Sequence, residues 1–223
     1  GPIVNPIEMA ATESIVIERL KSIPEYVELF KRAFPNEPDP VNYENVAKAI
    51  AAFERTLLTP SRFDKFLQGD TSALTSEEKE GLKLFIEVGC VTCHNGVGIG
   101  GNMFQKFGLT KPYYEAIKYD DPSKIDEGRY TVTKSEGDKF VFKVPSLRNV
   151  SRTYPYFHDG SVWELEKAVD IMAEIQLGRK LEPQQISKIV SFLKALEGEI
   201  PKDALQLPVL PPSTEKTPKP DIN

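Results

Sequence analysis

Residues 89–94 read Gly89-Cys90-Val91-Thr92-Cys93-His94, and they hold both cysteines and one of the two histidines of the 223-residue chain. The spacing C-x-x-C-H is typical of c-type haem attachment, in which two thiols add to the haem vinyl groups and the adjacent imidazole binds the iron. Two intervening residues allow one turn of chain to bring Cys90 and Cys93 to the same porphyrin edge, with His94 beneath the metal. The sequence therefore predicts one covalently bound haem c.

Two other chemistries use paired cysteines, and both fit this chain less well. A zinc site needs four ligands, and His158 is the only further Cys or His outside the motif. A redox C-x-x-C pair is expected in a βαβ setting and has no need of His94. Because the haem uses both thiols, no disulfide is predicted. Haem of this type is attached outside the cytoplasm, so we expect a periplasmic or otherwise extracytoplasmic protein.

The composition excludes several classes of function. The chain has 28 Lys and Arg against 33 Asp and Glu, a net charge of −5 and a pI of about 5.3. No dense basic run is present to neutralise a phosphate backbone, so nucleic acid is not an expected partner. No stretch approaches the roughly 20 apolar residues of a membrane helix, and the N-terminus lacks a signal-peptide pattern. We expect a soluble chain that is already processed or truncated.

Helical periodicity dominates the sequence, which predicts a mainly α-helical fold. Thr75 and Glu78 have the spacing of a capping box at the start of the helix that leads to the haem motif. The buried face expected on that helix comprises Leu82, Phe85 and Ile86. An apolar stripe over 42–58 comprises Val46, Ala49, Ile50, Phe53 and Leu57. Two later helices are expected from the apolar spacing over 165–172 and 186–196, the second opened by Glu182-Pro183 and ended by Gly198.

Other segments are predicted to be non-helical. Short β-rich pieces at 129–133 and 139–144, joined by a turn at Gly137-Asp138, predict one small β-hairpin in the charged segment 120–144. Four glycines within 96–101 predict a flexible loop that can press its backbone against a flat cofactor. The last 23 residues contain six prolines, so an extended tail is expected there.

The sixth ligand of the iron decides between electron transfer and chemistry on a small ligand. We favour Met172, on a helix, because its thioether stabilises ferrous iron; the alternative is a methionine that fills a gap in the core. Met103 lies only nine residues after His94 and ranks lower. His158 is the next candidate, although its aromatic neighbours are equally typical of a packed patch. A His/Met iron is closed to peroxide and passes electrons only.

Several blocks of sequence together resemble the bacterial dihaem cytochrome c peroxidases, relatives of the dihaem enzymes that mature methylamine dehydrogenase. The blocks are 1–9, Ser61-Arg62-Phe63-Asp64, 89–94, Val144-Pro145-Ser146-Leu147-Arg148-Asn149, 155–160 and 170–172. The resemblance implies an N-terminal haem that splits hydrogen peroxide and a C-terminal His/Met haem that accepts electrons from a small c-type cytochrome or cupredoxin. It also implies a homodimer.

Individual residues take roles from this resemblance. His94 and Met172 match the ligands of the electron-accepting haem, and methionine at 172 favours the peroxidases over the maturation enzymes. Glu8 matches the distal glutamate over the peroxidatic haem, where a carboxylate can shuttle a proton between the peroxide oxygens. Thr153 and Pro155 match positions whose backbone carbonyls bind a calcium. Arg148 is a candidate for a bidentate contact with a haem propionate, and equally for a surface ion pair.

The chain also departs from the family, because it contains a single C-x-x-C-H. The second motif is expected before Gly1, and Trp163, the sole tryptophan, matches a packing position. We therefore expect residues 1–59 to form the rear of a peroxidatic domain, 60–200 a cytochrome-c-like haem domain and 201–223 the tail, with no peroxide reduction by this chain alone. The alternatives are a stand-alone monohaem electron carrier and a haem-based sensor with an open sixth site.

Overall fold

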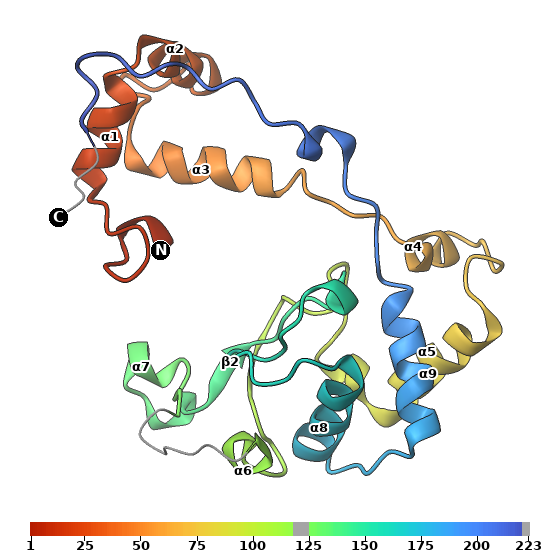
Figure 1. Cartoon of the computed structure of the whole chain (residues 1–223). Helices are drawn as coiled ribbons and strands as arrows, with labels where there is room; N and C mark the ends of the chain where they lie inside the picture. The colour runs from red at the N-terminus through yellow and green to blue at the C-terminus, as the bar shows by residue number, and fades with distance from the viewer. Residues whose placement is uncertain (118–124, 220–223) are drawn as a thin grey trace. The chain divides into compact units, whose positions relative to one another are not determined.

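The computed structural model describes residues 1–117 and 125–219, and it divides the chain into two compact units. The first unit combines residues 1–58 with the C-terminal segment from Ile200, and the second comprises residues 59–199. Both units are mainly helical, as the sequence predicts (Figure 1). None of the described helices is long and apolar enough to cross a membrane.

The first unit consists of short helices and the returning C-terminal segment. Thr12 and Asn42 cap the starts of two of its helices through their side chains. The helices are α1 (Glu13–Lys21), α2 (Pro24–Ala33) and α3 (Tyr43–Glu54), with 3-10 turns at Pro2–Val4 and Lys202–Leu205. The C-terminal segment is held near α1, since Ser22 donates to Thr217 Oγ1 at 2.8 Å and accepts from Thr214 Oγ1 at its carbonyl at 2.9 Å.

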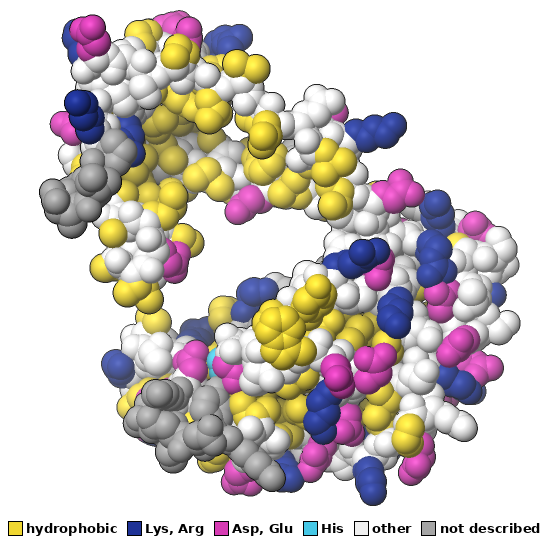
Figure 2. Space-filling view, viewed as in Figure 1, with side chains coloured by type: hydrophobic (Ala, Val, Ile, Leu, Met, Phe, Trp, Pro, Cys, Tyr) yellow, Lys and Arg dark blue, Asp and Glu magenta, His cyan; other side chains and the backbone are white. Residues whose placement is uncertain are grey.

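The apolar stripe predicted over 42–58 is only partly buried. Val46 is buried, whereas Ile50 and Phe53 are exposed, Phe53 by 58%. A unit of this size offers little apolar surface with which to surround a helix. Apolar side chains consequently gather on the surface of this unit in Figure 2.

The second unit is built around three helices that share one apolar core. Its helices are α4 (Arg62–Leu67), α5 (Ser76–Val88), α6 (Tyr113–Ile117), α7 (Tyr130–Thr133), α8 (Leu165–Leu177) and α9 (Pro183–Lys194). The predicted capping box of Thr75 and Glu78 is confirmed at the start of α5. Phe85 of α5 meets Phe192 of α9, with 5.4 Å between ring centroids. Ile86, predicted to be buried, is 51% exposed because it lies about 100° around the helix from Phe85.

The crossing of α5 and α9 depends on Gly81. A Cβ at this position would overlap the carbonyl oxygen of Lys188 and lie 2.9 Å from Cβ of Phe192. We expect Gly81→Ala to lower the free energy of unfolding by about 1–3 kcal/mol, because the overlap outweighs the better helix propensity of alanine. Gly137→Ala is the control, since its Cβ has room, with Ser135 Oγ at 3.9 Å. Equal urea midpoints for the two variants would contradict this account.

The predicted β-hairpin is wrong. Strand β2 (Val141–Lys143) pairs antiparallel with β1 (Phe104–Lys106), in the register Phe104 opposite Lys143, and residues 130–133 form α7. Phe107, directly after β1, packs edge to face on Phe142 of β2, and the region of the predicted first strand keeps only an isolated parallel bridge from Gly128 to Val141. Residues 118–124, which include part of the predicted charged segment, lie outside the described residues.

Candidate haem site

The motif residues lie on one tight turn at the end of α5. Gly89 ends the helix in the left-handed conformation, with φ of 108°, and residues 90–92 continue as a 3-10 turn. The amides of Cys93 and His94 both donate to the carbonyl of Cys90, at 3.3 and 3.0 Å. The turn therefore gathers both thiols and the imidazole within a few residues of backbone, as haem attachment requires.

The pKa of the Cys90 thiol favours haem attachment over thiol redox catalysis. Both cysteines are free and half-buried. Burial raises the pKa of the Cys90 thiol to about 11. A redox C-x-x-C pair needs a lowered pKa, because the thiolate is the reactive form. In the part of the chain that the structure describes, no group of three or more His, Cys, Asp or Glu side chains is placed to hold a metal ion.

The His94 imidazole is set up as a neutral ligand. Burial lowers its pKa, and the neutral ring is the form that binds iron. Its Nδ1 atom is buried and has no hydrogen-bond partner among the described residues. A Cβ on Gly100 would lie 3.1 Å from Nδ1 and would overlap the carbonyl oxygen of Pro145. Because Gly100 has no side chain, the backbone of Pro145 can lie close to the His94 ring.

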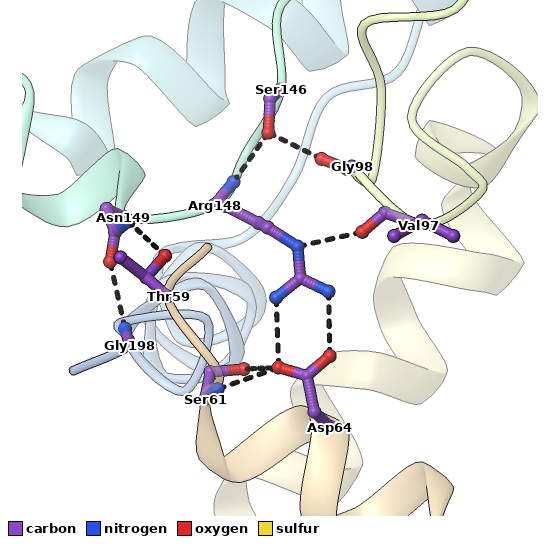
Figure 3. Close-up of polar contacts among 9 residues, drawn as sticks. All are labelled: Thr59, Ser61, Asp64, Val97, Gly98, Ser146, Arg148, Asn149 and Gly198. Carbon is purple, nitrogen blue, oxygen red and sulfur yellow. Dashed lines mark hydrogen bonds and ion pairs between the residues drawn. The ribbon is translucent and has the colours of Figure 1, made fainter. Parts of the chain in front are cut away.

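Hydrogen bonds fasten the glycine loop after His94 to residues 144–148, and Figure 3 shows the two at Val97 and Gly98. Arg148 Nε donates to the carbonyl of Val97 at 2.7 Å, and Ser146 Oγ donates to that of Gly98 at 2.6 Å. Backbone bonds continue the contact, from Leu147 to Ile99 at 3.2 Å and from Gly101 to Val144 at 2.8 Å. The loop is therefore held in one conformation although its sequence predicts flexibility.

An ion pair joins this contact to α4. Arg148 Nη1 and Nη2 donate to the two carboxylate oxygens of Asp64 at 2.9 and 2.7 Å, which is a bidentate geometry (Figure 3). The backbone amide and hydroxyl of Ser61 both donate to Asp64 Oδ2 at 2.7 Å. Arg148 and these donors hold the pKa of the Asp64 carboxyl well below its usual range. Asp64 is consequently ionised at neutral pH.

Met172 lies half-buried on α8. It is one turn before Gln176 and shares its helix face. Gln176 Oε1 accepts from the amides of Gly108 and Leu109, and its Nε2 donates to the carbonyl of Lys106 at 3.0 Å. This face of α8 is therefore directed at the segment that follows the glycine loop. Met172 is not among the described half-buried apolar side chains that pack against the main core.

The other two candidate ligands occupy different surroundings. Met103 is 36% exposed, and its carbonyl accepts from the amide of Val144 at 2.9 Å, beside the two-stranded sheet. His158 is exposed, and its ring stacks on Phe142 with 4.2 Å between centroids. Its aromatic neighbours include Tyr113, at 5.2 Å. These ring contacts agree with the aromatic-patch interpretation of His158.

The residues assigned by resemblance lie outside this turn. Glu8 is exposed in the first unit, where Asn5 Nδ2 donates to its carboxylate at 2.9 Å. Thr153 and Pro155 are exposed and follow the 3-10 turn at Val150–Arg152. Arg148 is engaged in the ion pair with Asp64, and its side chain is 21% exposed. A propionate contact and a calcium site stay predictions.

The site contains functional residues that sequence reasoning missed. Asp64 and Pro145 both lie in blocks that carry the family resemblance, but nothing in the sequence pairs either with its contact. Gln176 gave no signal beyond its position one turn after Met172. The sequence showed Gly100 only as one of the glycines in the loop. Nothing in the sequence singled it out as the glycine next to His94.

These features together fit a haem c. Two thiols on one turn, a neutral imidazole with an unsatisfied Nδ1 and a glycine cradle match what covalent attachment and axial ligation need. Cys90, Cys93 and His94 would hold the group from one side.

Comparisons with known proteins agree with the site. Residues 1–72 match the family model of di-haem cytochrome c peroxidase, and residues 78–197 match that of cytochrome c. The chain is 48% identical to cytochrome c551 peroxidase of Pseudomonas aeruginosa, covering 99% of this chain and 62% of that protein. It is 49% identical to cytochrome c551 peroxidase of Nitrosomonas europaea, covering 98% of this chain and 63% of that protein. The chain thus spans about three fifths of these relatives.

A solved structure extends the likeness to the fold. The crystal structure of a MauG-like protein associated with microbial copper homeostasis matches with a TM-score of 0.70 at 28% sequence identity. The match covers 87% of this chain and 65% of that one.

Proposed function

The chain belongs to the di-haem cytochrome c peroxidase family, and from this membership we propose that it carries the electron-accepting haem of a peroxide-reducing enzyme. The observation that carries the proposal is the single turn that gathers Cys90, Cys93 and a neutral His94 beneath a fastened glycine loop. The haem supplies one-electron chemistry, and the protein residues attach, ligate and shield it.

We assign the two axial positions to His94 and Met172. Burial keeps the His94 ring neutral, and its Nδ1 is free to donate to a backbone carbonyl once Nε2 binds iron. Two observations support Met172: it lies half-buried on the same face of α8 as Gln176, and it is not among the described half-buried apolar side chains packed on the main core. A thioether in this role raises the reduction potential. With His94 and Met172 on the two axial positions, a bound haem would supply electron relay and would be closed to peroxide.

In the whole enzyme, hydrogen peroxide, two electrons and two protons give water, and a reduced small c-type cytochrome or cupredoxin supplies the electrons. Cys90, Cys93, His94 and Met172 would hold the haem at which electrons enter, and peroxide chemistry would belong to a second haem. Glu8 is the proton carrier there; the hydrogen bond from Asn5 restrains its carboxylate. We place the enzyme in the periplasm, because attachment of haem c occurs outside the cytoplasm. The homodimer is proposed from the family resemblance alone.

Three further assignments belong to this proposal. Residues 1–59 form the rear of the peroxidatic domain, 60–200 the cytochrome c domain and 201–223 the tail. The carbonyls of Thr153 and Pro155 bind calcium, a hard cation that takes oxygen ligands. Arg148 spends three of its five N–H groups on Asp64 and Val97, which leaves two for a haem propionate.

A stand-alone electron carrier is the second candidate, because this chain holds one haem motif. The two functions share the first step and differ in the next. In the enzyme, an electron taken up at the site of Cys90, Cys93 and His94 would go on to a second haem that supplies the peroxide chemistry. In the carrier, the electron would go on to another protein.

Electron uptake tests the proposal. The chain, matured with its haem, is mixed in a stopped-flow instrument with a prereduced small c-type cytochrome. We expect each chain to take up one electron, and the Cys90→Ala/Cys93→Ala variant, which carries no haem, to take up none. In the complete gene product, peroxide should then reoxidise the donor. A haem-bearing chain that stays oxidised beside an excess of reduced donor would contradict the proposal.

A further inference from the structure

We propose that Arg148 and Asp64 form a positioning pair, which locks the glycine loop against His94 and thereby sets the reduction potential of the bound haem. The inference rests on the haem site proposed above. It gives the pair a role in tuning the ligand, in addition to any contact that Arg148 makes with the haem itself.

The pair starts from a fixed carboxylate. Asp64 is the third residue of α4, and its Oδ2 accepts from both the amide and the hydroxyl of Ser61 at 2.7 Å. Ser61 is buried. Its backbone also forms an isolated β-bridge with Gly198, after α9. Ser61 therefore holds the Asp64 carboxylate in place independently of Arg148.

The anchored Asp64 carboxylate in turn fixes the orientation of the Arg148 guanidinium. Two parallel bonds to Asp64 define the plane of the Arg148 group, and its third donor, Nε, then meets the carbonyl of Val97 at 2.7 Å (Figure 3). A lysine in this place would keep the charge but has no planar fork with which to hold both groups. The side chains of Asp64 and Arg148 are 25% and 21% exposed, so the pair is shielded more than a surface ion pair.

The glycine loop connects the Arg148–Asp64 pair to His94. Val97, Gly98, Ile99 and Gly101 are each bonded to residues 144–148, and Gly100 lies between Pro145 and Nδ1 of His94. Glycines give this loop little stiffness of its own, so external bonds must hold it. Loosening of the Val97 contact therefore changes how the Pro145 backbone approaches the imidazole. That approach governs how strongly the ring donates to the iron.

A second ion pair in the same unit provides a matched control. Arg62, on α4, makes a bidentate contact with Glu78 at the start of α5, with 2.7 Å from Nη1 to Oε2. This pair has the same chemistry and is also partly buried, but the contacts it makes do not include the glycine loop. Because Glu78 also closes the capping box of α5, its loss reports what a partly buried ion pair and a helix cap contribute to stability without touching the glycine loop.

The test measures the reduction potential of the haem-bearing chain by spectroelectrochemistry in Arg148→Lys and Asp64→Asn. We expect both to raise the potential, because a displaced Pro145 backbone would accept less well from the Nδ1–H of the iron-bound ring, which would make His94 a poorer donor to ferric iron. The expected size is about tenfold in the one-electron reduction equilibrium, or ~59 mV. Arg148→Lys keeps the charge, so its shift reports geometry. The double variant should shift no further than Asp64→Asn, because the two residues act as a unit.

Controls separate positioning from folding and from simple charge. Glu78→Gln should lower the urea midpoint and leave the potential unchanged. Ser146→Ala, which releases the Gly98 carbonyl and the backbone amide of Arg148 but leaves the Arg148 guanidinium on Asp64 and Val97, should fold normally and raise the potential by a smaller factor. An unchanged potential in Arg148→Lys and Ser146→Ala would overturn the inference, as would fully additive shifts in the double variant. Absence of haem from the unmodified chain would instead defeat the proposed function, and it is visible in the spectrum before any titration.

Discussion

Met172→Ala should lower the reduction potential of the haem by roughly a few tenths of a volt, within the span of about 0.8 V that axial ligation covers. The substitution removes the soft sulfur that stabilises ferrous iron and leaves the sixth position to water or an added ligand. α8 should persist, because alanine favours helices and Met172 lies outside the set of side chains packed on the core. The readouts are a redox titration and the loss of the near-infrared band of methionine ligation.

Two variants serve as controls for this assignment. Met103→Ala removes a methionine beside the two-stranded sheet, and His158→Ala removes a ring stacked on Phe142. Both should leave the potential and the near-infrared band in place. A large shift in either of them, with none in Met172→Ala, would transfer the sixth ligand to that residue.

Among the glycine-to-alanine substitutions in the loop, Gly100→Ala should disturb the haem site most. The added carbon would overlap the carbonyl oxygen of Pro145 and press on Nδ1 of His94, at 3.1 Å. Relief requires the loop or residues 144–148 to move, and this movement displaces the axial ligand. We expect a fall in the fraction of low-spin, six-coordinate haem, measured by its absorption spectrum.

Gly101→Ala isolates the steric part of this effect. Both glycines have positive φ, 117° and 87°, so both substitutions carry backbone strain, but a Cβ on Gly101 would meet nothing within 4 Å. The free energy of unfolding should therefore be about 1–3 kcal/mol lower for Gly100→Ala than for Gly101→Ala. Equal stabilities and equal spectra would show that the Pro145 approach to His94 is unimportant.

Sequence patterns predicted the structure correctly where it depends on residues that are close together in the chain. The capping box of Thr75 and Glu78 needs only residues three apart, and α5 starts there as predicted. The haem motif is equally local, since one turn of chain carries both cysteines and His94. Even so, Ile86 is exposed beside buried Phe85, because the face of a helix that becomes buried depends on its packing partners.

Distant contacts were beyond the reach of those patterns. Strand 141–143 pairs antiparallel with 104–106, and with the nearer β-rich piece it shares only an isolated parallel bridge at Gly128 and the bond from the Arg129 amide to the Val141 carbonyl. Packing of Phe107 on Phe142 accompanies the distant pairing. Arg148 and Asp64 are 84 residues apart. Their sequence blocks could be recognised, but no spacing rule joins a carboxylate on one helix to a guanidinium in a later loop. The part of the haem site that holds His94 in place is therefore visible only in the folded chain.

The central claim is that one haem is covalently attached through Cys90 and Cys93. The most direct measurement is the denatured mass of the intact chain after expression with the machinery for c-type haem attachment, compared with that of the Cys90→Ala/Cys93→Ala variant. We predict that the unmodified chain gains the mass of a single haem and that the variant gains nothing. An unmodified chain found at the mass of its polypeptide alone would contradict the account.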